Sequence, residues 1–415
     1  MGELPVPVCP QQTYVSATYD GNVVFPYFDI ATKYGFANYF FQTNQGPSMP
    51  AHQFLFSGTS APSGVVGQGY WNYFEAENPH GGAGCTAPAG ATVKLIDKSG
   101  GENISVHPCF SHNSLPTLLD PNHIGWKYYA NASPGWDIWN APNAIAEICL
   151  PTTSSGECMG PDYINNDVLN PSQVLHDLGV VSPQECGLRN VSWVIPNGDR
   201  SDHPGLLTGK QNKSTDIEGG PAWVADIINA VGNSPCKNVD NSNYWNTTAI
   251  FVVWDDWGGF WDHIQPYEVL IDDPAHGMHC DPATTFGCGY VSGFRVPFLV
   301  VSAYTAAGYV SGTPSQGGKT FPYIHDFGSI LAFIENNFLG FNQIGQINPT
   351  YNFADNFAPD FKPNPPHVPL ADFFPLRSPR QFQPITLPPG APDANYFLNY
   401  NGPILDPDND VIDND

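Results

Sequence analysis

The chain of 415 residues carries 39 Asp and Glu against 14 Lys and Arg, which gives a formal net charge of -25 at pH 7. Such a charge repels nucleic-acid backbones and anionic lipid surfaces, and no basic stripe is present, so we expect no nucleic-acid partner. The hydrophobic fraction of 41% excludes a disordered chain. No run of about 18 apolar residues occurs, so we expect no integral membrane segment.

In chain order, the first part of the sequence predicts short helices separated by irregular loops. A short amphipathic helix is expected at 24–35, and a turn followed by a helix at 46–58, where two prolines lie near the helix start. Residues 60–113 are Gly-rich and irregular, with one strand expected in "ATVKLID". A helix, a turn and a strand are expected at 114–130.

The later part contains the strongest patterns. The expected elements are a strand running into a turn at 191–198, a helix at 220–233, a strand in "AIFVVWDD", a strand at 295–304 and a helix at 326–338. Strands without polar alternation, separated by helices, predict a sheet that is buried on both faces. We therefore expect an α/β sandwich with a largely parallel central sheet.

This pattern ends near residue 340. We expect residues 1–340 to form one α/β domain. Residues 341–415 are rich in Pro, Asn, Asp and Phe and end in "DPDNDVIDND". We expect them to form an extended wrap over the domain, followed by an acidic tail.

The nine cysteines form no CxxC pair, which argues against a structural zinc site. The pairs Cys149–Cys158 and Cys280–Cys288 each bracket a short loop that a disulfide can close. We therefore expect an oxidising compartment, with the protein secreted or periplasmic. The N-terminus lacks the basic and apolar regions of a signal peptide, so we expect upstream sequence to be missing.

Two adjacent carboxylates, Asp255 and Asp256, stand at the end of the apolar strand "AIFVVWDD". Ligands of open α/β sheets bind beyond the carboxyl ends of the strands, and Gly258 and Gly259 permit a turn that brings both acids to one point. Paired carboxylates away from water repel each other unless a cation lies between them. We predict that the pair binds one divalent metal ion; the alternative is a cap or a surface turn.

A hydroxyl is expected at the start of the helix in "GPSMPAHQ". Ser48 would lie at the helix N-terminus, where free amide donors stabilise an alkoxide and bind phosphate. His52 follows four residues later and would share that face of the helix. The alternative is an ordinary N-cap serine.

Histidines supply the remaining candidates. In "NGDRSDHPG", His203 lies close to Asp199 and Asp202 and is placed to hold a phosphoryl oxygen or protonate a leaving group. His263 and His325 are weaker candidates for a phosphate or supporting role. The alternative for each is a polar loop histidine.

Five segments, taken in order, resemble those of the bacterial phosphoesterase family, which contains phosphatidylcholine-hydrolysing phospholipases C and an acid phosphatase. They are "GPSMPAHQFLFSGTS", "SWVIPNGDRSDHP", "WDDWGGFWDHIQP", "FRVPFLVVSAYTAAGYVS" and "HDFGSILAFIENNF", and together they cover roughly residues 24–340. The resemblance implies an alkaline-phosphatase-like fold. It also implies a phosphate-ester small molecule or a phospholipid head group as the substrate.

By the same resemblance, Ser48 is the nucleophile that becomes phosphoserine, Asp255 and Asp256 hold the metal, and His203 hydrogen-bonds the transferred group. The family's Glu-Asn segment does not precede Ser48, and Ala51 stands where the family has Asn. We therefore expect an N-terminally truncated chain that lacks the first strand of the domain.

Two rival interpretations remain open. The missing Glu-Asn segment favours a degenerate, non-catalytic extracellular binding protein of the same fold. A sulfatase-like hydrolase is disfavoured, because His52 stands where sulfatases have an Arg.

Overall fold

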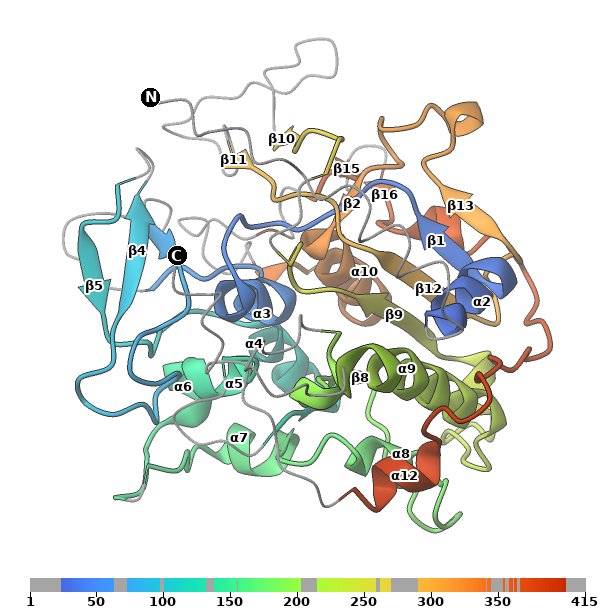
Figure 1. The fold of residues 1–415 in the computed structure, drawn as a ribbon, viewed down its shortest axis with the longest axis horizontal. Helices are drawn as coiled ribbons and strands as arrows, with labels where there is room; N and C mark the ends of the chain where they lie inside the picture. Colours follow the sequence, from blue (N-terminus) through green and yellow to red (C-terminus); the bar gives the residue numbers. More distant parts are fainter. Residues whose placement is uncertain are drawn as a thin grey trace.

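The computed structural model describes residues 24–62, 73–97, 101–131, 138–154, 156–202, 215–258, 262–269, 290–340, 342–344, 354, 358–360, 362–363 and 366–400 (Figure 1). None of the helices in these ranges combines the length and the apolar character that crossing a bilayer requires.

The central sheet has four strands in the order β13, β1, β12, β9. They span Tyr309–Ser311, Gly35–Ala37, Phe298–Ser302 and Ala249–Val253. Strands β1 and β13 pair in parallel, while β12 pairs antiparallel with both β1 and β9. Three of the four strands therefore run in one direction and β12 runs against them, so the sheet is mixed.

Alternate side chains of β12 bury the two faces of this sheet. Phe298 and Val300 pack into a core shared with α3, Ser48–Ser57, and α10, Phe327–Leu339. Leu299 and Val301 pack into a second core shared with α2, Phe25–Lys33, and α9, Thr215–Asn233. Figure 1 shows α2 and α9 alongside β12 and β9. This arrangement confirms the predicted α/β sandwich and explains why the first four residues of β12 are all apolar.

Smaller sheets surround this sandwich. A parallel sheet contains β7, β6 and β8, which span Asp167–Val168, Trp126–Tyr129 and Val191–Val194. An antiparallel sheet contains β3, β4 and β5, which span Tyr73–Glu75, Val93–Asp97 and Ile104–Val106. Three two-stranded pairs are β2, Phe40–Phe41, with β14, His325–Asp326; β10, Glu268–Val269, with β11, Tyr290–Val291; and β15, Lys362–Pro363, with β16, Pro366–His367.

Short helices connect these elements. The α-helices are α4, Leu115–Leu119; α5, Ala141–Ala144; α6, Ala146–Cys149; α7, Pro161–Asn166; α8, Gln173–Asp177; and α12, Ala394–Leu398. The 3-10 turns are η1, Asp120–Asn122; η2, Gly198–Arg200; η3, Tyr244–Asn246; η5, Pro314–Gln316; and η7, Ala371–Phe373.

The predicted helices and strands are present within a few residues of their expected bounds. The main difference lies in 60–113, where a single strand was expected and the structure has a three-stranded sheet. Strands β3 and β5 have three residues each, too few for an alternating pattern to identify them from the sequence.

The described C-terminal residues pack against the rest of the fold. Leu370 and Phe373 join the core beneath α10, and Phe397 packs beside α9. The Arg200 guanidinium lies 4.8–5.1 Å from the ring centres of Trp223, Phe397 and Tyr400. The C-terminal residues therefore help to hold the turn that contains Arg200, while the boundary at residue 340 stays a prediction.

Three disulfides lie in the described ranges. They join Cys85 to Cys109, Cys149 to Cys158 and Cys186 to Cys236. The predicted Cys149–Cys158 bond is confirmed, whereas Cys280 and Cys288 lie outside the described residues. The disulfides support an oxidising compartment.

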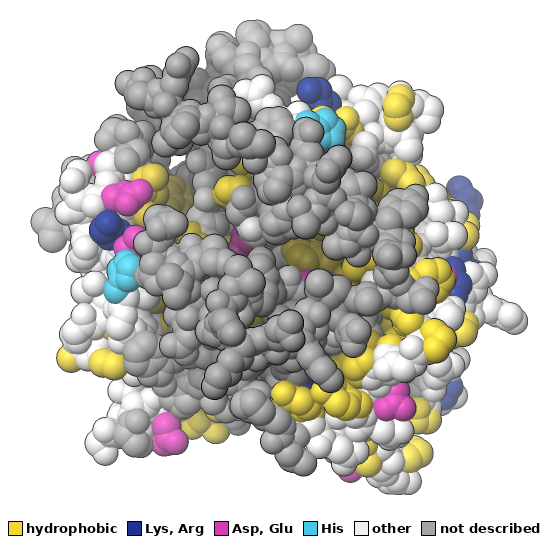
Figure 2. Space-filling model, in the orientation of Figure 1, with side chains coloured by type: hydrophobic (Ala, Val, Ile, Leu, Met, Phe, Trp, Pro, Cys, Tyr) yellow, Lys and Arg dark blue, Asp and Glu magenta, His cyan; other side chains and the backbone are white. Residues whose placement is uncertain are grey.

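On the face drawn in Figure 2, the described Lys and Arg side chains lie apart from one another. They form no continuous basic patch among the described residues of this face.

Strand β3 ends in a buried acid whose removal should stabilise the fold. Neither carboxylate oxygen of Glu75 has a hydrogen-bond partner in the part of the chain that the structure describes. Burial raises the pKa of Glu75 well above its ordinary value, and the nearby Glu77 carboxylate raises it further. A raised carboxyl pKa favours the folded state at low pH, and this contribution is lost as the pH rises through the folded-state pKa.

We therefore expect Glu75→Gln to stabilise the protein by about 1–3 kcal/mol at pH 8, because the amide carries no charge to bury. The gain should shrink at pH 4. Calorimetric melting at both pH values measures the difference, and a gain that is equal at both would contradict an ionisable origin.

Candidate active site

Ser48 begins helix α3 directly after an extended residue, Pro47, and its side chain is buried. The loop before it is held by Gln42 Nε2, which donates to the Gly46 carbonyl at 2.6 Å. The next backbone amide, that of Met49, donates to Asn78 Oδ1 at 3.0 Å. The Ser48 hydroxyl therefore has a fixed position at a helix N-terminus, as predicted from the sequence.

The paired acids meet this hydroxyl at the end of β9. Ser48 Oγ donates to Asp256 Oδ2 at 3.2 Å, and the Gly258 amide donates to Asp256 Oδ1 at 2.6 Å. Gly258 has a φ of 63°, in the left-handed region that glycine adopts at little cost. This turn directs the Asp256 side chain to Ser48, although the two residues are 208 positions apart in the sequence.

Asp255 contacts the other predicted residue of α3. Its Oδ2 lies 3.3 Å from His52 Nε2. That oxygen is buried and makes no hydrogen bond of good geometry within the described residues. Burial raises the pKa of Asp255, but the His52 imidazole and then the Ser48 hydroxyl outweigh it, so the pKa lies below the ordinary value. Asp255 is therefore ionised at neutral pH.

Tyr128 of β6 supports His52, and the sequence analysis missed it. The Tyr128 hydroxyl donates to the Trp139 carbonyl at 2.7 Å and lies 3.3 Å from His52 Nδ1. Tyr128 therefore contacts the Nδ1 side of the imidazole, while Asp255 lies at its Nε2 side. No local signal in "WKYYA" indicates this role, since it depends on β6 passing beside α3.

The donors at this site fit a hard divalent cation in part. Two carboxylates and one hydroxyl offer oxygen ligands, and the buried Asp255 Oδ2 has no hydrogen bond there to satisfy it. Within the described ranges, however, no group of three or more His, Cys, Asp and Glu side chains could hold a metal ion. A bound ion would therefore need Ser48, water or substrate oxygens as further ligands.

The loop that was expected to carry His203 is described only up to Asp202, and His203 itself lies outside the described residues. Asp202 Oδ2 accepts a hydrogen bond of 2.6 Å from the Tyr27 hydroxyl. The Tyr27 ring packs edge-on against Trp254, at 4.9 Å between ring centres. Since Trp254 directly precedes Asp255, these contacts tie Asp202 to the end of β9.

The two weaker histidine candidates lie apart from Ser48. The His263 side chain is 75% exposed and contacts Asp262. His325 is fully buried, with Nδ1 2.7 Å from Asp360 Oδ2 and Nε2 2.8 Å from Ser311 Oγ. In the described part of the chain, the structure brings neither of them to the Ser48 hydroxyl.

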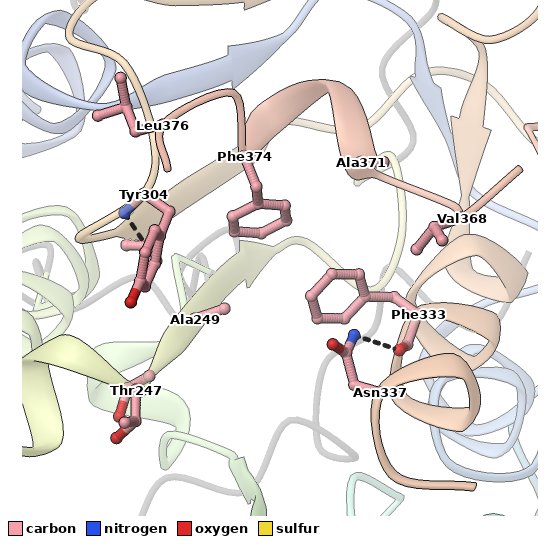
Figure 3. A pocket seen from close by; sticks show the side chains of 11 residues that line it. Thr247, Ala249, Tyr304, Phe333, Asn337, Val368, Ala371, Phe374 and Leu376 are labelled. Carbon is pink, nitrogen blue, oxygen red and sulfur yellow. Dashed lines mark hydrogen bonds between the residues drawn. The ribbon is translucent and has the colours of Figure 1, made fainter. Parts of the chain in front are cut away.

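A cavity of about 400 Å³ lies at the other end of β9. Ala249, Tyr304, Phe333 and Phe374 contribute to its wall (Figure 3). Ala249 begins β9, whereas Asp255 follows the end of that strand. The cavity is therefore separate from the serine–carboxylate site.

Fold and site together define an α/β protein with a serine hydroxyl facing paired carboxylates at the end of a central strand. The chain belongs to the phosphoesterase family, whose model matches residues 8–339.

Characterised relatives carry phospholipase names. The chain is 25% identical over 227 residues to the non-hemolytic phospholipase C of Burkholderia pseudomallei, covering 53% of this chain and 26% of the relative. It is 24% identical over 339 residues to the non-hemolytic phospholipase C of Pseudomonas aeruginosa, covering 75% and 39%. It is 29% identical over 221 residues to the non-specific phospholipase C6 of Arabidopsis thaliana, covering 52% and 34%. The matched region is thus well under half the length of each of these relatives.

Proposed function

We propose that this protein is a phosphoric ester hydrolase that acts through a phosphoserine intermediate at Ser48, with one divalent metal ion held by Asp255 and Asp256. The observation that carries this proposal is the 3.2 Å hydrogen bond between Ser48 Oγ and Asp256 Oδ2 at the end of β9. Membership of the phosphoesterase family gives the reaction class.

In the proposed reaction, Ser48 Oγ attacks the substrate phosphorus. The new O–P bond forms as the bond to the leaving alcohol breaks, and water then hydrolyses the phosphoserine. Asp256 Oδ2 accepts the Ser48 hydrogen bond and is placed to hold that proton. His52 lies against Asp255 at 3.3 Å, and the positive end of the α3 dipole favours the developing alkoxide. A divalent ion, when bound, lowers the serine pKa and neutralises phosphoryl oxygens.

His203, which follows Asp202, is the residue proposed to hydrogen-bond the transferred phosphoryl group or to protonate the leaving oxygen. His263 and His325 are left with supporting roles only. Phosphate-ester small molecules and phospholipid head groups are the proposed substrate classes, because the relatives named above are phospholipases C.

We propose a secreted or periplasmic location. Three disulfides support it, since such bonds persist in oxidising compartments.

A substrate panel tests the proposed activity. The purified full chain, supplied with divalent metal, should release p-nitrophenol from p-nitrophenyl phosphate, from p-nitrophenylphosphorylcholine or from both. The preferred compound distinguishes a monoesterase from a phospholipase-C-like diesterase. If neither compound is turned over with any of Mg²⁺, Ca²⁺, Mn²⁺ and Zn²⁺, the hydrolase proposal fails.

In that case the alternative, a non-catalytic binding protein of the same fold, is favoured. One observation supports this alternative. Within the described ranges, no three side chains of His, Cys, Asp or Glu lie together in a way that could hold a metal ion.

A further inference from the structure

The buried acid Asp326 lies between the loop that leads to Ser48 and segment 262–269, which follows the paired acids. Asp326 is fully buried and follows His325 in β14, which pairs in parallel with β2 so that Asp326 lies opposite Phe41. Its Oδ1 accepts the Ser329 amide at 3.1 Å and caps helix α10. Its Oδ2 is left for a second partner.

On one side, the start of α10 holds the loop that leads to Ser48. The Phe327 amide donates to Thr43 Oγ1 at 3.0 Å, and Thr43 is fully buried five residues before Ser48. The neighbouring Gln42 carbonyl accepts from the Gly293 amide at 2.8 Å. The position of the Ser48 loop is therefore set by β14, the start of α10 and the segment at 293.

On the other side, Asp326 holds the segment that follows the paired acids. The Tyr267 hydroxyl donates to Asp326 Oδ2 at 3.0 Å, and its ring packs edge-on against Phe41 at 5.0 Å. The Tyr267 backbone exchanges two hydrogen bonds with Ser292, at 3.0 and 3.1 Å. The same tyrosine therefore contacts the strand before the Ser48 loop and the carboxylate of β14.

We propose that Asp326, through Tyr267, is a positioning residue that fixes segment 262–269, which follows the paired acids, relative to the Ser48 loop. This inference rests on the proposed function. A hydrogen bond in the low-dielectric interior is stronger than one in water, so a single buried contact can set such a position. A displacement of about 1 Å between reacting groups costs as much as 10²-fold in rate.

A matched pair of substitutions separates positioning from simple stability. Tyr267→Phe removes the hydroxyl that reaches Asp326, while Tyr309→Phe removes a bond from Tyr309 to Asp372 Oδ2 at 2.8 Å and one from Gln316 Nε2 to Tyr309 at 2.9 Å. These bonds join β13 to the turns η5 and η7 and reach neither site segment. Tyr309→Phe should therefore lose at least as much thermal stability as Tyr267→Phe. Only Tyr267→Phe should lower kcat, by about tenfold, with KM changed less than about twofold.

Asp326→Ala supplies a second variant of the same contact. Alanine removes the oxygen that accepts from Tyr267 together with the oxygen that caps α10, so this variant should lose more thermal stability than Tyr267→Phe. Its kcat and KM should change as in Tyr267→Phe. If both variants match Tyr309→Phe in kcat, the positioning role is wrong.

Amide hydrogen exchange of the full-length protein gives a readout that needs no turnover. Residues 40–53 and 262–269 should exchange faster in Tyr267→Phe than in Tyr309→Phe. Equal exchange in the two variants would overturn the proposal even if the enzyme is active. If the wild type hydrolyses no ester, the proposed function fails separately, and this comparison still decides whether the contact holds the two segments.

Discussion

Replacing Ser48 with alanine is expected to reduce turnover of phosphate esters by on the order of 10³-fold or more. The hydroxyl at this position is the proposed nucleophile, and water cannot take over its place at the helix N-terminus without losing the covalent step. The substitution removes one buried oxygen and leaves a good helix former, so α3 should remain folded. Steady-state kinetics with the preferred p-nitrophenyl substrate measure the effect.

Ser57→Ala is the matched control for this loss. Ser57 ends the same helix, and its buried hydroxyl has no hydrogen-bond partner within the described residues. This control should keep full activity. Acid quenching during turnover should also trap one phosphoryl group on the peptide that contains Ser48. Activity that persists in Ser48→Ala, or a phosphoryl group trapped on another residue, would contradict the assignment.

Removing one of the paired acids is expected to abolish tight metal binding. Asp256→Asn takes away a negative charge that would bind a cation. It also weakens the acceptor for the Ser48 hydroxyl, whose Oγ lies 3.2 Å from Asp256 Oδ2 in the wild type. We expect the affinity for divalent metal to fall by about 100-fold or more, and activity to fall with it. Calorimetric titration of the chelator-treated protein measures the affinity without any need for turnover.

Asp240→Asn controls for the change in net charge. Asp240 is an exposed acid that accepts hydrogen bonds from Ser242 in its own turn. Metal affinity should be unchanged in this variant. Unchanged affinity in Asp256→Asn as well would remove the metal site from the proposal, and failure of the wild type to bind any divalent ion would favour the non-catalytic alternative.

The sequence was informative where local patterns are strong. Helix α9 was predicted from apolar residues at helical spacing, helix α3 from the two prolines near its start, and strand β9 from its continuous apolar run. The meeting of Ser48 with Asp256 follows from a general rule, because ligand sites of α/β sheets lie beyond the carboxyl ends of the strands. The left-handed Gly258 was also foreseeable, since paired acids can point to one place only after a sharp turn.

Contacts between distant segments were not predictable in the same way. From the sequence, Tyr128 and Tyr267 look like ordinary aromatic residues of a strand and a loop. Their roles follow from contacts across the fold, because Tyr128 lies beside His52 and Tyr267 beside Asp326. The direction of β12 was also hidden, because a strand buried on both faces looks the same whether its neighbours run parallel or antiparallel. The spacing of apolar residues indicates which side chains are buried, but it does not indicate which other element they pack against.

The three aromatic rings around the Arg200 guanidinium, those of Trp223, Phe397 and Tyr400, have a practical consequence for protein production. Two of these rings, those of Phe397 and Tyr400, come from the last described residues of the chain. A shortened version for crystallisation that stops near residue 340 would expose the guanidinium on one side. It would also strip Leu370 and Phe373 from the core beneath α10. Expression boundaries and affinity tags are therefore best placed beyond Tyr400.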